Sequence, residues 1–148
     1  MRIYMEYKAF TKENISEIIP LYIDYYNNAT SYVWTEETVY KSFSQRLSRD
    51  DSYGFILVNV NCAIGFVIGY FEQFDDGVVY NLIEIVIAKE YQSQGLGTKL
   101  MLELQSRVKA MGAMLINLQA VNDNEHDKFY GRLGYNNCKN LILKVKIL

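Results

Sequence analysis

Hydrophobic and polar positions repeat with two different periods along the chain, and each period predicts a different kind of element. After Thr11, a potential helix cap, apolar residues recur at helical spacing. They are Ile15, Ile18, Ile19, Tyr22, Ile23 and Tyr26. Pro20 lies within this stretch, so we expect the helix to kink or divide there. The preceding segment, Arg2–Phe10, is short and carries aliphatic and aromatic residues, which predicts a strand.

A second helix and a run of strands follow. The sequence Thr35-Glu36-Glu37-Thr38 is typical of a helix start. Three extended segments come next, separated by short turns at residues 59–61 and 75–77. These segments are Tyr53–Val58, Cys62–Phe71 and Val78–Ile87. The first two predict an antiparallel hairpin.

The second half of the chain begins with a return to the helical period. From Gly95 an apolar stripe runs to Met111, and Gly112 follows as a stop signal. The stripe consists of Leu96, Leu100, Leu104, Val108 and Met111. Ala113–Val121 then predicts a strand, and Asp123–Leu133 predicts a short helix.

The last segment, from Tyr135 to residue 148, shows a strand-like alternation. Leu141, Leu143, Val145 and Ile147 alternate there with Lys144 and Lys146, which predicts one or two final strands. The whole pattern indicates an α+β fold with a mixed, mostly antiparallel central sheet flanked by helices. One strand–helix–strand crossover, from Val78 to Val121, should be right-handed with parallel strands. With no repeat or linker in the sequence, residues 1–148 are expected to form a single domain.

Composition excludes several classes of protein. Hydrophobic residues make up 50% of the 148 positions, and the net charge of −2 gives no basic field for nucleic acid. No apolar run approaches the ~20 residues that cross a bilayer, and Met1–Glu6 lacks the apolar stretch of a signal peptide. We therefore expect a cytoplasmic protein without a membrane partner. Cys62, Cys138 and His126 are too few and too scattered for a zinc site, so no metal is expected.

The most informative segment is a glycine-containing turn between a buried strand and a helix. Gly95 and Gly97 stand at the helix start, where backbone N–H groups and the helix dipole favour a phosphate or pyrophosphate. The order Gly97-Thr98-Lys99 does not fit a P-loop. Leu100 stands where a dinucleotide-binding fingerprint has its third glycine.

Two motifs together resemble the GCN5-related N-acetyltransferase (GNAT) family. Gln92-Ser93-Gln94-Gly95-Leu96-Gly97 is similar to the family's pyrophosphate loop, Gln/Arg-x-x-Gly-x-Gly/Ala. Further on, Phe129-Tyr130 and Leu133-Gly134-Tyr135 match a second family pattern. The resemblance covers residues 78–135, whereas the first half matches only in its order of elements. It implies an N-acetyltransferase domain of GNAT-like fold, with the pyrophosphate loop on the crossover.

The resemblance also implies acetyl-CoA as cosubstrate and a set of residues that bind it. The pantetheine arm would follow the backbone of Ile85, Val86 and Ile87. The pyrophosphate would lie on the loop formed by Gln92, Ser93, Gln94, Gly95, Leu96, Gly97 and Thr98. The family's usual Asn falls on Asp123, with Asn122 and Asn124 beside it, so which of the three contacts the cofactor stays open.

Catalysis in this family is direct attack of a neutral amine on the thioester in a ternary complex. Tyr130 would lie near the cofactor and donate a proton to the leaving thiolate. Glu84, on the central strand, is the candidate general base, acting through water. Each residue also has a structural interpretation: Tyr130 could pack its helix, and Glu84 could be bonded within the sheet or face solvent.

The acceptor is an amine of a small molecule or a peptide. Tyr26, Tyr32, Trp34 and Glu72 are the candidate substrate-binding residues, because aromatic rings and carboxylates suit a cation. They could equally be core or solvated residues. Dimers are common in the family, so a homodimer is compatible with the resemblance, but no sequence feature specifies one. Two alternatives remain: a non-catalytic acyl-CoA-binding or regulatory module on the same fold, and an unrelated nucleotide-binding protein.

Overall fold

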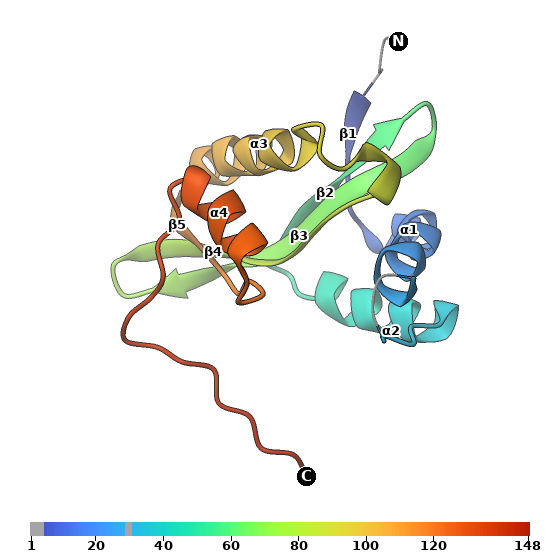
Figure 1. The fold of residues 1–148 in the computed structure, drawn as a ribbon. Coiled ribbons are helices and arrows are strands. Elements are labelled where there is room, and N and C mark those ends of the chain that lie inside the picture. The colour runs from blue at the N-terminus through green and yellow to red at the C-terminus, as the bar shows by residue number, and fades with distance from the viewer. Residues whose placement is uncertain (1–4, 29–30) are drawn as a thin grey trace.

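The computed structural model describes residues 5–28 and 31–148 and contains a mixed sheet with the strand order β1-β2-β3-β4-β5 (Figure 1). The strands are β1 (Met5–Ala9), β2 (Ser52–Asn59), β3 (Cys62–Phe74), β4 (Gly77–Ile87) and β5 (Ala113–Leu118). Neighbours from β1 to β4 are antiparallel, and β5 is parallel to β4. The predicted α+β class, with a mostly antiparallel sheet and one parallel crossover, is confirmed.

Helices cover both faces of the sheet (Figure 1). They are α1 (Ile15–Asn27), α2 (Glu36–Leu47), α3 (Leu96–Ala110) and α4 (Asn124–Arg132), with short 3-10 turns η1 (Lys12–Asn14) and η2 (Lys89–Tyr91). Successive side chains of a strand point to opposite faces. Thus Phe55 and Leu57 of β2 pack in the core beneath α3, whereas Ile56 and Val58 pack in the core with α1 and α2. The two hydrophobic cores enclose the sheet from both sides.

The N-terminal elements agree with the sequence pattern in all but one respect. α1 is not divided at Pro20 and continues to Asn27. Proline removes only one backbone hydrogen bond, while Ile15 and Tyr22, on either side of it, are both buried against the sheet. Of the predicted first strand, residues 5–9 are observed as β1, and residues 2–4 lie outside the described part of the chain.

The C-terminal elements bring a correction. The prediction of one or two strands after Tyr135 is wrong, because residues 136–148 are exposed and belong to no strand. An alternating apolar pattern gives a chain the side chains of a strand but cannot provide the neighbouring strand with which it must pair. The strand predicted over residues 113–121 ends at Leu118. In the described ranges, no helix has the length and apolar character needed to cross a membrane.

Candidate active site

The candidate site lies where β4 and β5 separate. They pair only between Val78–Leu82 and Ala113–Leu118. On its other side β4 carries a bulge, since Gly69 of β3 faces Leu82 while Ile68 faces Glu84, leaving Ile83 as an extra residue. A bulge bends a strand and redirects its side chains. Beyond it, a cleft of about 570 Å³ opens between β4 and the segment 118–121 that follows β5.

A second hollow of about 290 Å³ continues the cleft toward the glycine-containing loop. It shares Tyr25, Ile85, His126 and Tyr130 with the first cleft and reaches Gly97 at the start of α3. The edge of β4 therefore runs, without a paired strand on this side, from the loop to the middle of the cleft.

The loop has the backbone conformation of an anion site. Ser93 and Gly95 have positive φ angles of 61° and 80°. Gly95 is the N-cap of α3 and no side chain caps the helix start, so the first-turn amides keep their donor capacity at the positive end of the helix. The Gln92 side chain donates to the Ile87 carbonyl at 2.9 Å and ties the loop to the end of β4. Lys89, which lines the cleft, adds a positive charge nearby.

Gly95 and Gly97 are required for different reasons. A Cβ at Gly95 would meet nothing within 4 Å, so glycine is favoured there by the left-handed backbone conformation and not by lack of space. A Cβ at Gly97 would lie 3.4 Å from the Phe129 ring, so glycine there allows α4 to pack closely on the start of α3. This packing brings the side chains of α4 over the cleft.

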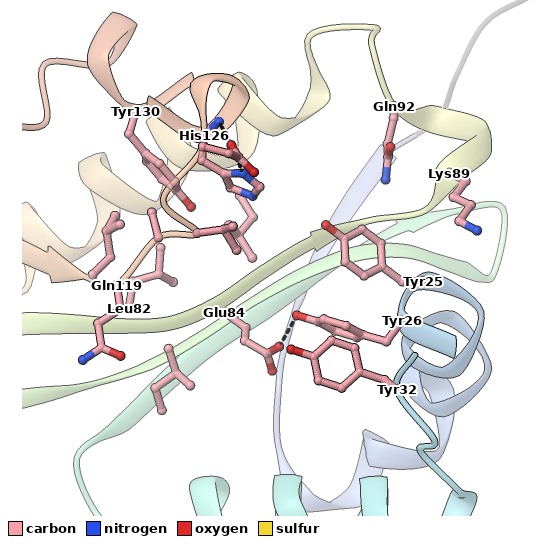
Figure 2. Close-up of a pocket in the computed structure, with 16 residues that line it drawn as sticks. Tyr25, Tyr26, Tyr32, Leu82, Glu84, Lys89, Gln92, Gln119, His126 and Tyr130 are labelled. Carbon is pink, nitrogen blue, oxygen red and sulfur yellow. Dashed lines mark hydrogen bonds and ion pairs between the residues drawn. The ribbon is translucent and has the colours of Figure 1, made fainter. Parts of the chain in front are cut away.

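Tyr130 of α4 lines both hollows, and its hydroxyl makes no hydrogen bond to any described residue. Burial, with smaller contributions from the neighbouring Tyr135 and Tyr25, raises the pKa of Tyr130 to about 12. The phenol is therefore a protonated donor at neutral pH, directed into the cleft (Figure 2).

Asp123 begins α4 and lies at the cleft. Its carboxylate accepts from the His126 backbone amide at 2.8 Å and contacts His126 Nδ1 at 2.7 Å. These bonds lower the pKa of Asp123, the backbone one most strongly. Asn122 and Asn124, the two other candidates for cofactor contact, do not line either hollow. The structure thus brings Asp123 and His126, and neither neighbouring Asn, to the cleft.

Glu84 faces the cleft from β4 beside Tyr26 (Figure 2), and three side chains donate to its carboxylate. Tyr26 donates to its Oε1 at 2.6 Å, Tyr22 donates at 2.9 and 3.0 Å to its two oxygens, and the Arg46 guanidinium pairs with Oε2. The side chain of Glu84 is only 14% exposed. Burial, followed by the Glu84 charge, raises the pKa of both Tyr22 and Tyr26 well above that of a free phenol.

The candidate acceptor residues divide into two groups. Tyr26 and Tyr32 line the cleft together with Tyr25. Trp34 packs against Tyr22 with ring centroids 5.3 Å apart and lines neither hollow. Glu72 accepts from Asn81 at 3.0 Å and is likewise not among the cleft residues.

Two residues that contact the candidate site residues have no clear signal in the sequence. Arg46 lies 38 positions before Glu84, on a helix with no motif, so only folding reveals their contact. In the sequence, His126 resembles an ordinary exposed helix residue. In the structure it contacts the capping residue Asp123 and lines the cleft. The spacing of Tyr22 and Tyr26, four residues apart on one helix face, does carry a signal for a shared contact. In the described ranges, no three His, Cys, Asp or Glu residues gather closely enough to hold a metal ion.

Comparison with known proteins identifies the family. Residues 15–135 match the Acetyltransferase (GNAT) family. An uncharacterized N-acetyltransferase of Archaeoglobus fulgidus is 25% identical over 101 residues, which cover 66% of this chain and 69% of that protein.

Solved structures share the fold at low identity. The aminoglycoside N-acetyltransferase AAC(6')-Iy in complex with CoA superposes with a TM-score of 0.76 at 16% identity, covering 99% of this chain and 97% of that one. An aminoglycoside acetyltransferase from an uncultured soil metagenomic sample, in complex with sisomicin, gives a TM-score of 0.73 at 12% identity over 98% and 96% of the chains. The family match over residues 15–135 places the chain among the acetyltransferases. The chain belongs to the GNAT family, and it is an N-acetyltransferase.

Proposed function

We propose that this protein, as a single domain over residues 1–148, transfers the acetyl group of acetyl-CoA to a primary amine of a small molecule or peptide. The amine attacks directly in a ternary complex. One observation carries the proposal: the opening between β4 and β5 has a phosphate-type loop at one end, with Tyr130 and the Glu84 cluster on opposite sides of its centre.

The residues fit a CoA-like molecule. The uncapped amides from Ser93 to Thr98 and the left-handed Gly95 suit a pyrophosphate. The edge of β4 at Ile85, Val86 and Ile87 has no partner in β5 and can bond an extended amide-containing arm. Acetyl-CoA would supply the acetyl group as a thioester. The related aminoglycoside N-acetyltransferase crystallised with CoA supports this choice of cosubstrate.

Two groups handle the protons. Tyr130 keeps its proton at neutral pH and donates it toward the leaving sulfur. Glu84 accepts the proton of the attacking amine. Because three donors already occupy its oxygens, the transfer runs through a water molecule or through Tyr26, whose hydroxyl donates to Glu84 Oε1.

The acceptor side favours a cationic small molecule. Tyr25, Tyr26 and Tyr32 surround the cleft near the Glu84 carboxylate, and aromatic faces with a carboxylate attract an ammonium group. The two structural neighbours that act on aminoglycosides support a polyamine-like or amino-sugar acceptor rather than a neutral one.

Release of free thiol from acetyl-CoA, measured across an amine library, tests the proposal. Tyr130→Phe should lower kcat by about 100-fold or more, because a general acid contributes about that factor. Tyr40→Phe, a change at an exposed tyrosine on α2, is the matched control and should leave kcat unchanged. Glu84→Gln should alter the pH profile of turnover.

Three results would contradict the proposal. Unchanged turnover and pH profile in both Tyr130→Phe and Glu84→Gln would refute the assigned residues. Thermal stabilisation by acetyl-CoA with no turnover on any amine would favour a non-catalytic acyl-CoA-binding module. Stabilisation by ATP or NAD but not by acetyl-CoA would indicate a nucleotide-binding protein instead.

A further inference from the structure

The pair formed by Asp123 and His126 lies at the cleft, and the proposed reaction gives it no role so far. His126 is the only histidine in the sequence, and its side chain, 39% exposed, lines both hollows. Asp123 Oδ1 accepts from the His126 backbone amide at 2.8 Å and lies 2.7 Å from His126 Nδ1. The residue that caps α4 therefore also holds the imidazole in one orientation.

This contact determines which ring nitrogen of His126 carries the proton. The backbone amide of His126, followed by its side chain, lowers the pKa of Asp123, so the carboxylate is ionised at neutral pH and can only accept. Nδ1 must then be the donor, and the lone pair of a neutral imidazole is left on Nε2. Nε2 has no hydrogen-bond partner among the described residues. His126 thus offers an unoccupied basic nitrogen at the cleft.

The carboxylate of Glu84 is more restricted as a proton acceptor. Its Oε1 accepts from Tyr22 and Tyr26, and its Oε2 accepts from Tyr22 and pairs with Arg46. Every oxygen of Glu84 is therefore engaged, whereas Nε2 of His126 is not.

The reaction has two protons to remove from the acceptor nitrogen. An alkylammonium holds its proton up to about pH 10, so one proton leaves before the attack and a second leaves when the amide forms. Glu84 accounts for one of them. Tyr130, whose pKa burial raises to about 12, must also regain a proton after it protonates the sulfur. A second acceptor beside Tyr130 would satisfy both needs.

His126 has the position that this acceptor requires. It precedes Tyr130 by four residues on α4, so the two side chains share one face of the helix. Both line both hollows, and Figure 2 shows them on the same side of the cleft, across from Glu84.

We propose that His126, positioned by Asp123, is a second proton acceptor in the acetyl transfer; the inference rests on the proposed function. Nε2 takes the proton that the ammonium loses before the attack, and the amine nitrogen then bonds to the thioester carbon. As the C–S bond breaks, the nitrogen gives its second proton to Glu84 and Tyr130 protonates the sulfur. The imidazolium returns its proton to the Tyr130 oxygen, and Glu84 releases its proton to water. One ammonium and one thioester thus give one amide, one thiol and one proton.

The groups that face His126 have charges of both signs. The titratable side chains that line the same hollows are Asp123, Glu125, Tyr130, Tyr25, Tyr26, Tyr32, Glu84 and Lys89. The carboxylates attract a protonated imidazole, and Lys89 repels it. Asp123 contacts the ring directly, so removal of its charge should have the clearest effect.

The pH profile of thiol release from acetyl-CoA, measured with an accepted amine, tests the proposal. The rate should fall from neutral to acidic pH, because histidine takes up a proton between about pH 5 and 8 and can then accept no other. His126→Gln should lower kcat about 100-fold at neutral pH and remove that decline, with little change in KM for acetyl-CoA.

Asp123→Asn separates the chemical role from the structural one. The Asn side chain still caps α4, but without the negative charge the acidic decline should move to lower pH. Asp127→Asn, at an exposed position of α4 that lines neither hollow, is the matched control and should follow the parent profile.

Proton NMR of the untagged chain gives a readout that needs no turnover. Because the sequence has one histidine, the imidazole Hε1 signal belongs to His126 alone. It should change with pH, change at a lower pH in Asp123→Asn, and shift when CoA is added, since CoA would occupy the hollows that His126 lines.

The outcomes separate this proton route from the proposed function. A parent that acetylates amines, with the same rate and pH profile in His126→Gln, would overturn the route alone. CoA that raises the melting temperature but leaves the Hε1 signal unmoved would do the same. An unshifted decline in Asp123→Asn would show that Asp123 only caps the helix, which also contradicts the route. A parent without turnover on any amine would overturn the proposed function, and the route with it.

Discussion

Glu84 has a structural role in addition to the chemical one that we propose for it. Its carboxylate is nearly buried and joins β4 to α1 through Tyr22 and Tyr26 and to α2 through Arg46. A buried charge without a partner destabilises a protein, so these three donors offset the cost of burying the Glu84 carboxylate. The same contacts fix the direction of the carboxylate toward the cleft, as the proton transfer that we propose for Glu84 requires.

Removal of Arg46 should therefore cost more than removal of an ordinary surface arginine. We expect Arg46→Ala to lower the free energy of unfolding by about 1–3 kcal/mol, because Glu84 loses its charged partner while two tyrosine donors remain. Arg49→Ala is the matched control. Its half-exposed pair with Asp51 should contribute less than about 1 kcal/mol.

Urea denaturation of both variants measures the difference. Adding Glu84→Gln to Arg46→Ala should recover part of the loss, since the unpaired charge is then removed. Equal losses for the two arginines would show that the Arg46–Glu84 contact contributes no more than a surface ion pair.

In the loop and helix at residues 92–110, the backbone conformation matters more than the side chains for the candidate phosphate site. Gly95 and Gly131 both have open space where a Cβ would lie. They differ in the backbone, because Gly95 has a left-handed conformation and Gly131 lies inside the helix α4. Any difference between alanine substitutions at these two glycines must therefore come from the backbone and not from steric contact.

The two glycines give opposite predictions for one chemical change. Gly95→Ala should lower the free energy of unfolding by about 1 kcal/mol, because alanine is strained at a φ of 80°. Gly131→Ala should raise it by about 0.5 kcal/mol, because alanine loses less backbone entropy in a helix.

Thermal or urea unfolding of the two variants provides the measurement. The affinity for acetyl-CoA, followed by calorimetry, should fall in Gly95→Ala and stay unchanged in Gly131→Ala. An unaltered affinity in Gly95→Ala would mean that the loop conformation is not needed for the pyrophosphate.

Tyrosines are distributed through both cores and the cleft, and this affects how the whole molecule responds to alkali. Burial raises the pKa of Tyr80, which donates to the Tyr53 carbonyl at 2.7 Å, and of Tyr22, Tyr26 and Tyr130. The folded chain therefore holds phenolic protons that the unfolded chain releases near its ordinary pKa of about 10. The contribution of these tyrosines to the free energy of unfolding is fully present below that pH and decreases as the pH rises above it.

We accordingly expect the melting temperature to decrease steeply from about pH 10 upward. At pH 8, Tyr80→Phe should have a free energy of unfolding about 1 kcal/mol lower than the parent, because a hydrogen bond is lost. Its melting temperature should then fall less steeply as the pH rises. Tyr40→Phe, at an exposed position, should follow the parent at every pH. Parallel alkaline declines for Tyr80→Phe and the parent would contradict the contribution assigned to Tyr80, because other titrating groups would then account for the whole loss.

Local patterns in the sequence were enough to predict most helices and strands, the fold class and the glycine-containing loop. The period of apolar residues sets α3, and the glycines at 95 and 97 indicate a phosphate-type turn, because helix period and backbone freedom depend on residues adjacent in the chain. Tyr130 could also be placed near the cleft through its motif, and the structure locates it there.

Contacts between distant residues were decided only by the tertiary structure. Arg46 and Tyr22 meet Glu84 across 38 and 62 positions, and the bulge at Ile83 that turns Glu84 appears only in the register of β4 against β3. The C-terminal segment, residues 136–148, shows that an apolar pattern alone does not form a strand. Its alternation specifies which side chains share a face, but a strand forms only where a second backbone is present to receive its hydrogen bonds.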